Sequence, residues 1–347
     1  MRRDTPLQLG PCDYNPRSIH HGSETRAEDR SSWSRIRAMK FLTTSALAMG
    51  LAFAVTSTPR AQAPGTCNRA CLTGFADTYF KALTANTPAA VPLAPNAKIT
   101  LNGKVVPLAT AFWDSADRAV YRWDIVNDRL GDVASEAVVQ NTDGSKTMYM
   151  VRMKVAAGKV TEVETIKANQ GEADRLWGPD NLKEVSPALQ LSIREAEQDS
   201  YYGLIAAAES YWRAFQTNGT KEYHPAALLP DARRFENGVQ TTGMVRDGAF
   251  VSAADGFDSG RFLGRNLWDR RYPVVDTERG IVLSIVRFGL KDGMKSQSVA
   301  TSNDRLVAEF FAVKKGMIQE IHAVLFNLPD AEPTGWAPEY GPRRGGN

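Results

Sequence analysis

The 347-residue sequence has few of the residues that build metal and redox sites: it contains three cysteines and four histidines. It also lacks a glycine-rich phosphate-binding loop, a nucleophile elbow and a zinc-binding histidine helix. These absences argue against nucleotide-dependent, serine-nucleophile and zinc-dependent enzymes. Any catalysis is therefore expected to be free of cofactors and metals.

The chain also lacks an apolar run long enough to span a membrane comfortably. The stretch MKFLTTSALAMGLAFAV, which starts at Met39, places a basic residue before a short apolar segment, as in a secretory signal. We expect residues 39–63 to be a signal peptide and residues 1–38 to precede the physiological start. The small-residue site AQA ends at Ala63, although Pro64 after it disfavours cleavage there. The predicted location is periplasmic or secreted.

The predicted mature chain has no excess of charge of one sign. Residues 1–63 hold nine of the 42 Lys and Arg and five of the 39 Asp and Glu, which leaves 33 basic and 34 acidic residues. A chain so balanced has no basic footprint for nucleic acid or for an anionic membrane surface. We expect neither partner.

Two cysteines remain after removal of the leader, Cys67 and Cys71. A disulfide is the favoured interpretation in an oxidising compartment. The bond is awkward inside a regular helix, so Cys67 is expected on the irregular segment before one. A metal site would need His224 or His322, and neither is close in sequence.

An internal repeat is the strongest signal in the sequence. ADTYFKAL from Ala76 aligns with AESYWRAF from Ala208, and PNAKITLNG from Pro95 aligns with PDARRFENG from Pro230. YRWDIVNDRLG and GKVTEVETI of the first copy match RRYPVVDTERG and GMIQEIHAVLF of the second. We predict a first domain at 67–168, a linker at 169–190, a second domain at 191–328 and a flexible tail at 329–347.

Each copy is expected to be an α+β unit. Both open with an apolar stripe at helical spacing, which includes Tyr79 in the first copy and Tyr211 and Trp212 in the second. Both end in strands joined by turns at Gly158 and Gly316. The order predicts a long N-terminal helix packed on a curved antiparallel sheet.

The order of elements and the terminal GKVTEV and GMIQEI strands resemble the nuclear-transport-factor-2-like superfamily, which includes the SnoaL-like and ketosteroid-isomerase-like proteins. The motifs CNRACLTGF, LAPNAKITLNGK and FENG are also similar to those of a secreted family with tandem units. The resemblance implies two cone-shaped units, each with an apolar pocket. It is weak for chemistry, because the superfamily includes isomerases, dehydratases, hydrolases and binding modules. Leu101 stands where the second copy has Glu236, so the first copy departs from the second at that acid.

The terminal hairpins carry the main candidate site. A two-residue turn at residues 315–316 places Glu309 opposite His322, within hydrogen-bonding reach and facing into the cone. The same spacing places Val151 opposite Glu164 in the first copy. A carboxylate beside a partly desolvated imidazole poises an acid or base near neutral pH. A buried structural ion pair is the alternative, and a three-residue turn would move the two side chains apart.

The candidate catalytic residues are therefore His322, Glu309 as its orienter and Tyr211 as a hydrogen-bond donor to an oxyanion. The candidates for substrate binding in the second domain are Trp212, Arg271, Trp268, Tyr272, Arg287 and Glu320. The first-domain equivalents are Tyr79, Glu164 and Arg122. For Tyr79 and Tyr211 the alternative is a core role with a satisfied hydroxyl. For Arg122, and for Arg271 with Trp268 and Tyr272 near it, the two interpretations are a rim cluster that clamps an anionic substrate and an ion-pair network that braces the loop.

The expected function is a cofactor-free isomerase, dehydratase or lyase that acts on a small apolar molecule in the second domain. The competing class is a binding or structural module. The second copy has an unusually apolar far face, which we predict to form a domain interface or a homodimer. Its predicted residues are Leu306, Ala308, Phe310, Ile321, Ala323 and Leu325.

Overall fold

The computed structural model describes residues 67–172, 176–216, 226–259, 262, 265–290, 304–328 and 334–336. All of them belong to one compact body, Arg60–Asn347. The predicted signal peptide and the residues before it lie outside the described residues. Among the described helices, none is both long enough and apolar enough to cross a membrane.

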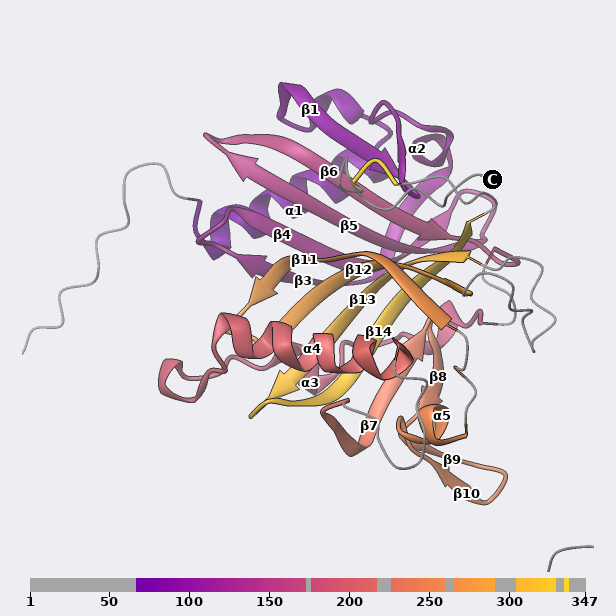
Figure 1. The fold of residues 1–347 in the computed structure, drawn as a ribbon. Helices are drawn as coiled ribbons and strands as arrows, with labels where there is room; N and C mark the ends of the chain where they lie inside the picture. The colour runs from indigo at the N-terminus through magenta and orange to yellow at the C-terminus, as the bar shows by residue number, and fades with distance from the viewer. Residues whose placement is uncertain are drawn as a thin grey trace, which may run out of the picture. The chain divides into compact units, whose positions relative to one another are not determined.

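The first sheet has six strands in the order β2-β1-β6-β5-β4-β3 (Figure 1). Its elements are α1 (Arg69–Thr84), η1 (Pro88–Ala90), β1 (Leu93–Leu101), β2 (Lys104–Val105), α2 (Ala111–Ser115), β3 (Ala116–Asn127), β4 (Asp132–Asn141), β5 (Lys146–Ala156) and β6 (Lys159–Ala168). We refer to these elements as the first unit.

The second sheet has the corresponding order, β8-β7-β14-β13-β12-β11. A connector with η2 (Pro179–Asn181), α3 (Pro187–Gln190) and η3 (Glu195–Glu197) leads to it. The second unit then contains α4 (Tyr201–Gln216), β7 (Leu228–Glu236), β8 (Val239–Thr242), β9 (Met244–Arg246), β10 (Ala249–Val251), α5 (Asp255–Asp258), β11 (Arg265–Asp276), β12 (Ile281–Leu290), β13 (Asp304–Lys314) and β14 (Met317–Leu328). The architecture is therefore α+β, with two six-stranded sheets.

The sheets are mixed, whereas the sequence led us to expect antiparallel ones. β1 pairs with β6, and β7 with β14, in parallel. A tight turn forces only consecutive strands to be antiparallel. β1 and β6 are neighbours in the sheet that no turn joins, so their relative direction follows from the whole chain path.

A long helix covers one face of each sheet. The buried stripe of α1 includes Leu72, Tyr79 and Leu83, and these side chains pack against the first sheet. The stripe of α4 packs against the second sheet in the same way. We call this side of each sheet the helix-covered face.

Two interactions, a hydrogen bond and a disulfide, fix the N-terminus of α1. The Asn68 side chain accepts a hydrogen bond from the Cys71 N–H at 2.9 Å, which satisfies one of the free donors of the first turn. A disulfide joins Cys67 to Cys71. Cys67 precedes the helix, where its backbone is free of helical geometry.

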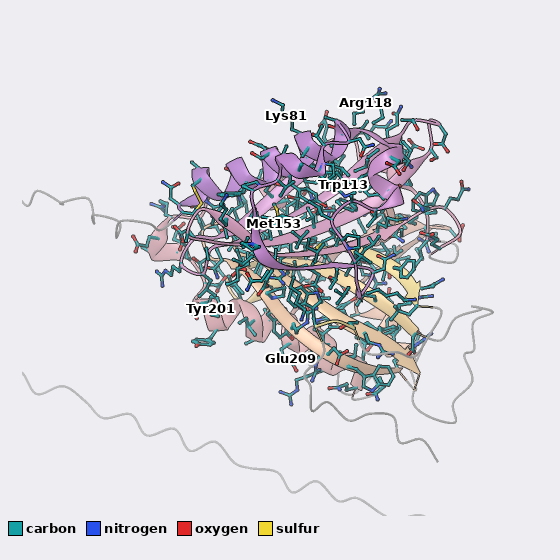
Figure 2. All side chains as sticks on the ribbon, turned by 90° about the horizontal axis from the view of Figure 1, so that it is seen from above. Lys81, Trp113, Arg118, Met153, Tyr201 and Glu209 are labelled. Carbon is teal, nitrogen blue, oxygen red and sulfur yellow. A yellow bond between two sulfur atoms is a disulfide. The ribbon has the colours of Figure 1, made fainter. Side chains whose placement is uncertain are left out.

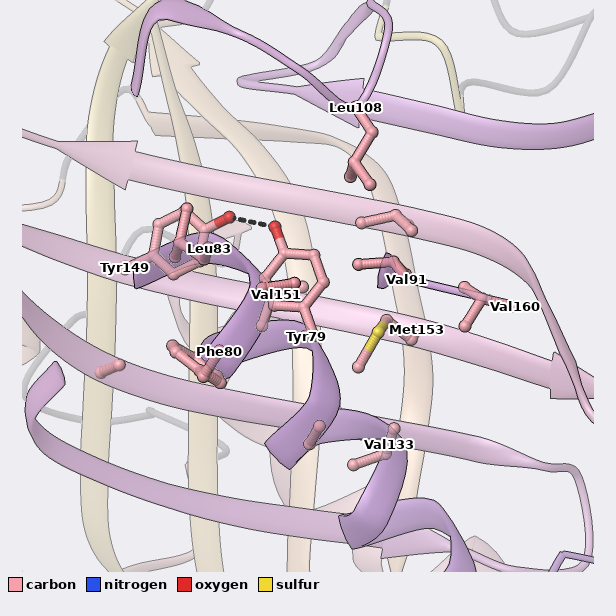
Figure 3. Close-up of a cluster of buried hydrophobic side chains, with 14 of the residues drawn as sticks. Tyr79, Phe80, Leu83, Val91, Leu108, Val133, Tyr149, Val151, Met153 and Val160 are labelled. Carbon is pink, nitrogen blue, oxygen red and sulfur yellow. Dashed lines mark hydrogen bonds between the residues drawn. The ribbon is translucent and has the colours of Figure 1, made fainter. Parts of the chain in front are cut away.

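Inside the first unit, side chains fill nearly all of the space under α1. The hydroxyls of Tyr79 and Tyr149 are 2.5 Å apart, and Val151 and Met153 lie beside them on the same face (Figure 3). A void bordered by both tyrosines has a volume of about 10 Å³. Seen from above, Lys81 and Arg118 point outward while Met153 lies within the molecule (Figure 2).

The opposite faces of the two sheets pack against each other and form one apolar cluster. Trp123 of the first sheet and Phe310 of the second have ring centroids 4.8 Å apart. Leu306 and Ala308 lie in the same cluster, as expected for a domain interface. We call this side of each sheet the inter-sheet face.

A β-bulge in each terminal hairpin changes which side chains share a face. The turns have positive φ at Ala157 and Gly158 and at Lys315 and Gly316, as expected for two-residue turns. Directly after the second turn, Val313 pairs with Ile318 but Ala312 pairs with Glu320. One extra residue in a strand reverses the side to which the following side chains point.

Because of these bulges, the faces that the sequence predicted by counting across the turns are wrong. Ile321, Ala323 and Leu325 lie on the helix-covered face and not on the apolar far face. In the first unit, Glu164 pairs with Arg152 and not with the predicted Val151, so it lies on the inter-sheet face, as does Ile166 two residues later. The strands themselves were placed correctly, and only the count across the bulge failed.

Part of the predicted flexible tail has a fixed place. Trp336 donates from its indole nitrogen to the Thr100 hydroxyl at 2.8 Å, and the Gly335 N–H donates to the Gly103 carbonyl at 2.7 Å. The Lys98 ammonium lies 4.2 Å from the Trp336 ring centre. Residues 334–336 therefore pack against β1, where Figure 1 shows them as a short yellow segment.

Candidate functional site

The predicted pair of Glu309 and His322 does not form. Glu309 pairs with Ala323 across the hairpin, and His322 pairs with Phe310. Directly paired residues point to the same side of a sheet, so Glu309 and His322 point to opposite sides. Glu309 lies on the helix-covered face and His322 on the inter-sheet face. The two-residue turn was predicted correctly, and the bulge after it moved the register by one.

His322 is buried between the two sheets, where it contacts two carboxylates. Its Nδ1 lies 2.8 Å from a Glu136 oxygen on β4, and its Nε2 lies 3.0 Å from a Glu320 oxygen on β14. Glu136 also accepts a hydrogen bond from the Trp123 indole at 2.7 Å. Burial lowers the pKa of His322, but the two carboxylates outweigh burial and raise it to about 9. The imidazole is therefore protonated at neutral pH and both ring nitrogens donate.

Glu320 extends this network to the surface. Burial opposes its ionisation, but the His322 hydrogen bond and charge, together with Arg233, lower the pKa of Glu320. It accepts hydrogen bonds from Arg233 and, at 2.9 Å, from Ser186. Glu320 thus belongs to the contact between the sheets and not to a pocket.

Glu164, the first-unit counterpart of His322, also bridges the sheets. Arg271 of β11 donates two hydrogen bonds to the Glu164 carboxylate, at 2.6 and 3.1 Å. Arg152 approaches the same carboxylate at 3.3 Å. Both copies therefore use this strand position for a buried ion pair between the sheets, which explains why an acid and a histidine can occupy it.

The other predicted substrate contacts are dispersed. Tyr272 donates to Glu209 on α4, on the other side of the sheet from Arg271. Arg287 lies on the inter-sheet face with Asp304 at 3.1 Å and near the Trp268 ring. The predicted rim cluster that would clamp an anion is therefore not assembled in the structure.

Three further predicted residues have structural contacts. Trp212 is buried and donates from its indole to Ser284 at 2.9 Å. Arg122 contacts Asp124 and Asp77, at 2.7 and 2.8 Å. The Tyr79 hydroxyl is occupied by Tyr149, as described above.

The helix-covered face of the second sheet carries a buried polar cluster that contains Tyr211 and Glu309. A row of paired residues crosses this face through Ser284, Glu309, Ala323 and Glu236. Arg234, two residues before Glu236, is 4% exposed. The sequence had indicated Tyr211 and Glu309 for this site.

Arg234 holds the cluster together. Its guanidinium donates to the Tyr211 hydroxyl at 3.1 Å and lies 3.4 Å from the Glu236 carboxylate. Its remaining contacts include the Thr241 hydroxyl at 3.0 Å. The sequence analysis did not predict Arg234 as a site residue. The signal was present in the alignment of PDARRFENG with PNAKITLNG, where the charged Arg234 stands opposite the apolar Ile99.

Glu309 is the group with the most unusual protonation in this cluster. Burial raises its pKa to about 8, with Glu236 acting in the same direction, while Arg234 and a hydrogen bond with Tyr211 oppose the shift. Arg234 compensates only part of the burial because its closest carboxylate is Glu236. The Glu309 carboxyl is therefore largely protonated at pH 7 and titrates just above it.

The first unit has apolar side chains where the second has charged ones. Val151 occupies the place of Glu309. Val151 pairs with Ser135 on the neighbouring strand, and Glu309 pairs with Ser284, the equivalent serine of the second unit. In the sequence alignment, Leu101 stands for Glu236 and Ile99 for Arg234. The fold is thus built once without any of these charges.

Metal ligation has no evident place in the described part of the chain, where no three His, Cys, Asp or Glu side chains gather as ligands. The cation beside Glu309 and Glu236 is Arg234. The side chains of this cluster can transfer protons and form hydrogen bonds.

A model of a protein family matches part of this chain. The family model described as "Domain of unknown function (DUF8021)" matches residues 197–325, which cover most of the second unit. No curated protein matches the sequence significantly.

Two solved structures are similar over about one unit. The 96–104 loop truncation variant of IdmH is 18% identical, covering 28% of this chain and 91% of its own, with a TM-score of 0.24. A ketosteroid isomerase candidate from Kribbella flavida DSM 17836 is 17% identical, covering 33% of this chain and 90% of its own, with a TM-score of 0.22. Such distant likenesses say nothing about a substrate.

Proposed function

We propose that the second unit is a cofactor-free acid–base site for a small, mainly apolar molecule that carries a carbonyl group. The observation that carries the proposal is the buried cluster of Glu309, Arg234 and Glu236, at positions where the first unit has hydrophobic side chains. Burying charge is costly, and the same fold forms without it. A function in the second unit explains why these buried charges are present despite their unfavourable free energy of burial.

Glu309 is the proposed acid and base. A group with a pKa close to the working pH can both give and take a proton, and Glu309 has a pKa of about 8. Tyr211 and Arg234 are the proposed donors to the oxygen on which negative charge develops. His322 is not part of this mechanism because it lies on the inter-sheet face.

These roles fit an isomerase, a dehydratase or a lyase. The Glu309 carboxylate would take a proton from the carbon next to the carbonyl, and the electron pair of that C–H bond would move to the oxygen held by Tyr211 and Arg234. Return of the proton to another carbon gives isomerisation. Loss of a neighbouring hydroxyl as water gives dehydration.

The first test is hydrogen exchange on model ketones. We expect the protein in D₂O to deuterate the α-carbons of at least one of cyclohexanone, 2-decalone and acetophenone, measured by proton NMR against buffer. Glu309→Gln should reduce the enzymatic rate at least about hundredfold, because general bases contribute that much. The rate should increase as the pH rises through about 8, since only the carboxylate form accepts a proton.

Glu195→Gln is the matched control, because Glu195 is an exposed carboxylate on η3 and should exchange like the parent. Equal rates in Glu309→Gln and the parent would refute the catalytic role. Ketones that bind without exchanging would favour the competing class, a non-catalytic binding module.

Stability provides a second test of the polar cluster. We replace its residues with those of the first unit, in the combination Arg234→Ile, Glu236→Leu and Glu309→Val, with Tyr211→Phe to avoid an unpaired hydroxyl. The free energy of unfolding from urea titration should stay equal or increase by up to about 2 kcal/mol, because hydrophobic replacements of buried charge clusters are often neutral or stabilising. A loss of stability would show that the cluster is structural.

We also propose export to the periplasm or the medium, directed by residues 39–63. The disulfide between Cys67 and Cys71 supports an oxidising compartment. A homodimer remains a prediction, although the apolar residues of the inter-sheet face are already covered within the chain.

A further inference from the structure

A cleft of about 990 Å³ lies at the end of the first unit, away from the polar cluster of the second. It is bordered by α2, by the turn between β4 and β5, by the residues that follow β6 and by the connector. Phe112 and Trp177 are its aromatic side chains. The volume is in the range of small-molecule sites, which combine apolar walls with a few polar groups.

The charges that line the cleft differ in how they are compensated. Lys146 forms an ion pair with Asp180, which connects β5 to the connector. The Lys167 ammonium lies 5.6 Å from the Phe112 ring centre, and among the described residues it has no carboxylate within ion-pair distance. Lys167 is half-buried, so an anion bound to it would be partly shielded from water.

An amide beside Lys167 is held in one orientation. The Thr147 hydroxyl accepts a hydrogen bond from the Asn141 amide at 3.1 Å and therefore donates to the Asn169 carbonyl oxygen, at 2.8 Å. The Asn169 NH₂ group has no acceptor among the residues that the structure describes. Lys167 near the end of β6 and Asn169 directly after β6 thus offer a cation and an amide donor to the same cleft.

The fold does not need a lysine at this position. The Asn102 side-chain amide accepts from the Lys167 N–H at 2.8 Å and donates to the Lys167 carbonyl at 3.1 Å. The Asn237 side-chain amide makes the same two bonds with the backbone of Leu325, at 2.9 and 3.0 Å. Leu325 is therefore the structural counterpart of Lys167, and it is a buried core residue of the second unit. A lysine where the sister unit has a core leucine points to a specific role.

We propose that this cleft binds a small amphipathic carboxylate. The carboxylate contacts the Lys167 ammonium and the Asn169 amide, and the apolar body lies against Phe112 and Trp177. Asp180 is compensated by Lys146, but Asp143 also lines the cleft and repels a second negative charge, so the ligand is a monoanion. The proposal is independent of the acid–base site in the second unit.

The test compares carboxylates with their neutral amides. The full chain is titrated with hexanoate and phenylacetate, and with hexanamide and phenylacetamide, by calorimetry at low salt. We expect saturable binding of at least one carboxylate and binding at least about tenfold weaker of its amide, as for the loss of one charge-assisted contact. Equal affinities, or no binding of either carboxylate, would overturn the proposal.

Variants then locate the site. Lys167→Gln should weaken the carboxylate about tenfold, while Lys159→Gln, the same charge change at the exposed start of β6, should not. Trp177→Ala tests the apolar wall independently of charge. Unchanged affinity in both Lys167→Gln and Trp177→Ala would place the binding elsewhere and refute the site. Glu309→Gln should bind like the parent, which separates this result from the proposed catalysis.

Discussion

Replacing His322 with leucine is expected to lower the free energy of unfolding by about 3–5 kcal/mol at pH 7. The leucine matches the volume of the imidazole, but it removes the cation between Glu136 and Glu320. Glu320 keeps Arg233 and Ser186 as partners, whereas Glu136 keeps only the Trp123 indole among the contacts described above. An uncompensated buried carboxylate is the source of the loss. Urea unfolding measures it.

A double-mutant cycle separates the ion pair from packing. Glu136→Leu alone is also destabilising, but in the His322→Leu background it removes an unpaired charge and should cost far less. The coupling should be in the upper part of the usual range of about 0.5–3 kcal/mol for contacting pairs. Additive losses would mean that His322 is held by packing alone and that no ion pair joins the sheets through it.

The second large effect is a loss of stability at alkaline pH. The pKa of His322 is raised from 6.5 to about 9 in the folded protein. A raised folded-state pKa means that the stabilisation is complete below pH 6.5 and disappears as the pH rises through about 9. At about 1.4 kcal/mol for each unit of pKa, the loss is about 3 kcal/mol.

Glu309 contributes with the same sign over a lower range, because its pKa rises from 4.5 to about 8 on folding. The His322 term is therefore obtained as the difference between the parent and His322→Leu, measured by urea unfolding from pH 6 to 10. This difference should shrink with increasing pH. A constant difference would show that His322 is not protonated in the folded state.

The sequence predicted the local elements of this protein well. The apolar stripes that contain Tyr79 and Tyr211 form helices, and the turns at Gly158 and Gly316 have the two-residue form that their composition requires. The position of Cys67 before its helix was also anticipated. Such features depend on residues close together in the chain, and a sequence pattern reports them directly.

The candidate site was predicted only in part. Tyr211 and Glu309 do lie together on the helix-covered face, where Arg234 joins them. The error concerned His322. The bulge next to the hairpin turn shifts the pairing by one residue, so the His322 side chain points to the opposite face of the sheet from Glu309. Nothing in the local composition marks the extra residue, and a single residue decides to which face a side chain belongs.

The sequence by itself determined the repeated α+β pattern, the apolar faces and the turn types, because these follow from spacing and backbone preference. Tertiary structure alone decided the partners of the buried charges. Glu136 is 186 residues from His322, and Arg271 is 107 residues from Glu164. Such pairs exist only because the two sheets pack face to face, and the desolvation of each charge is balanced by a partner that the chain brings in from the other unit.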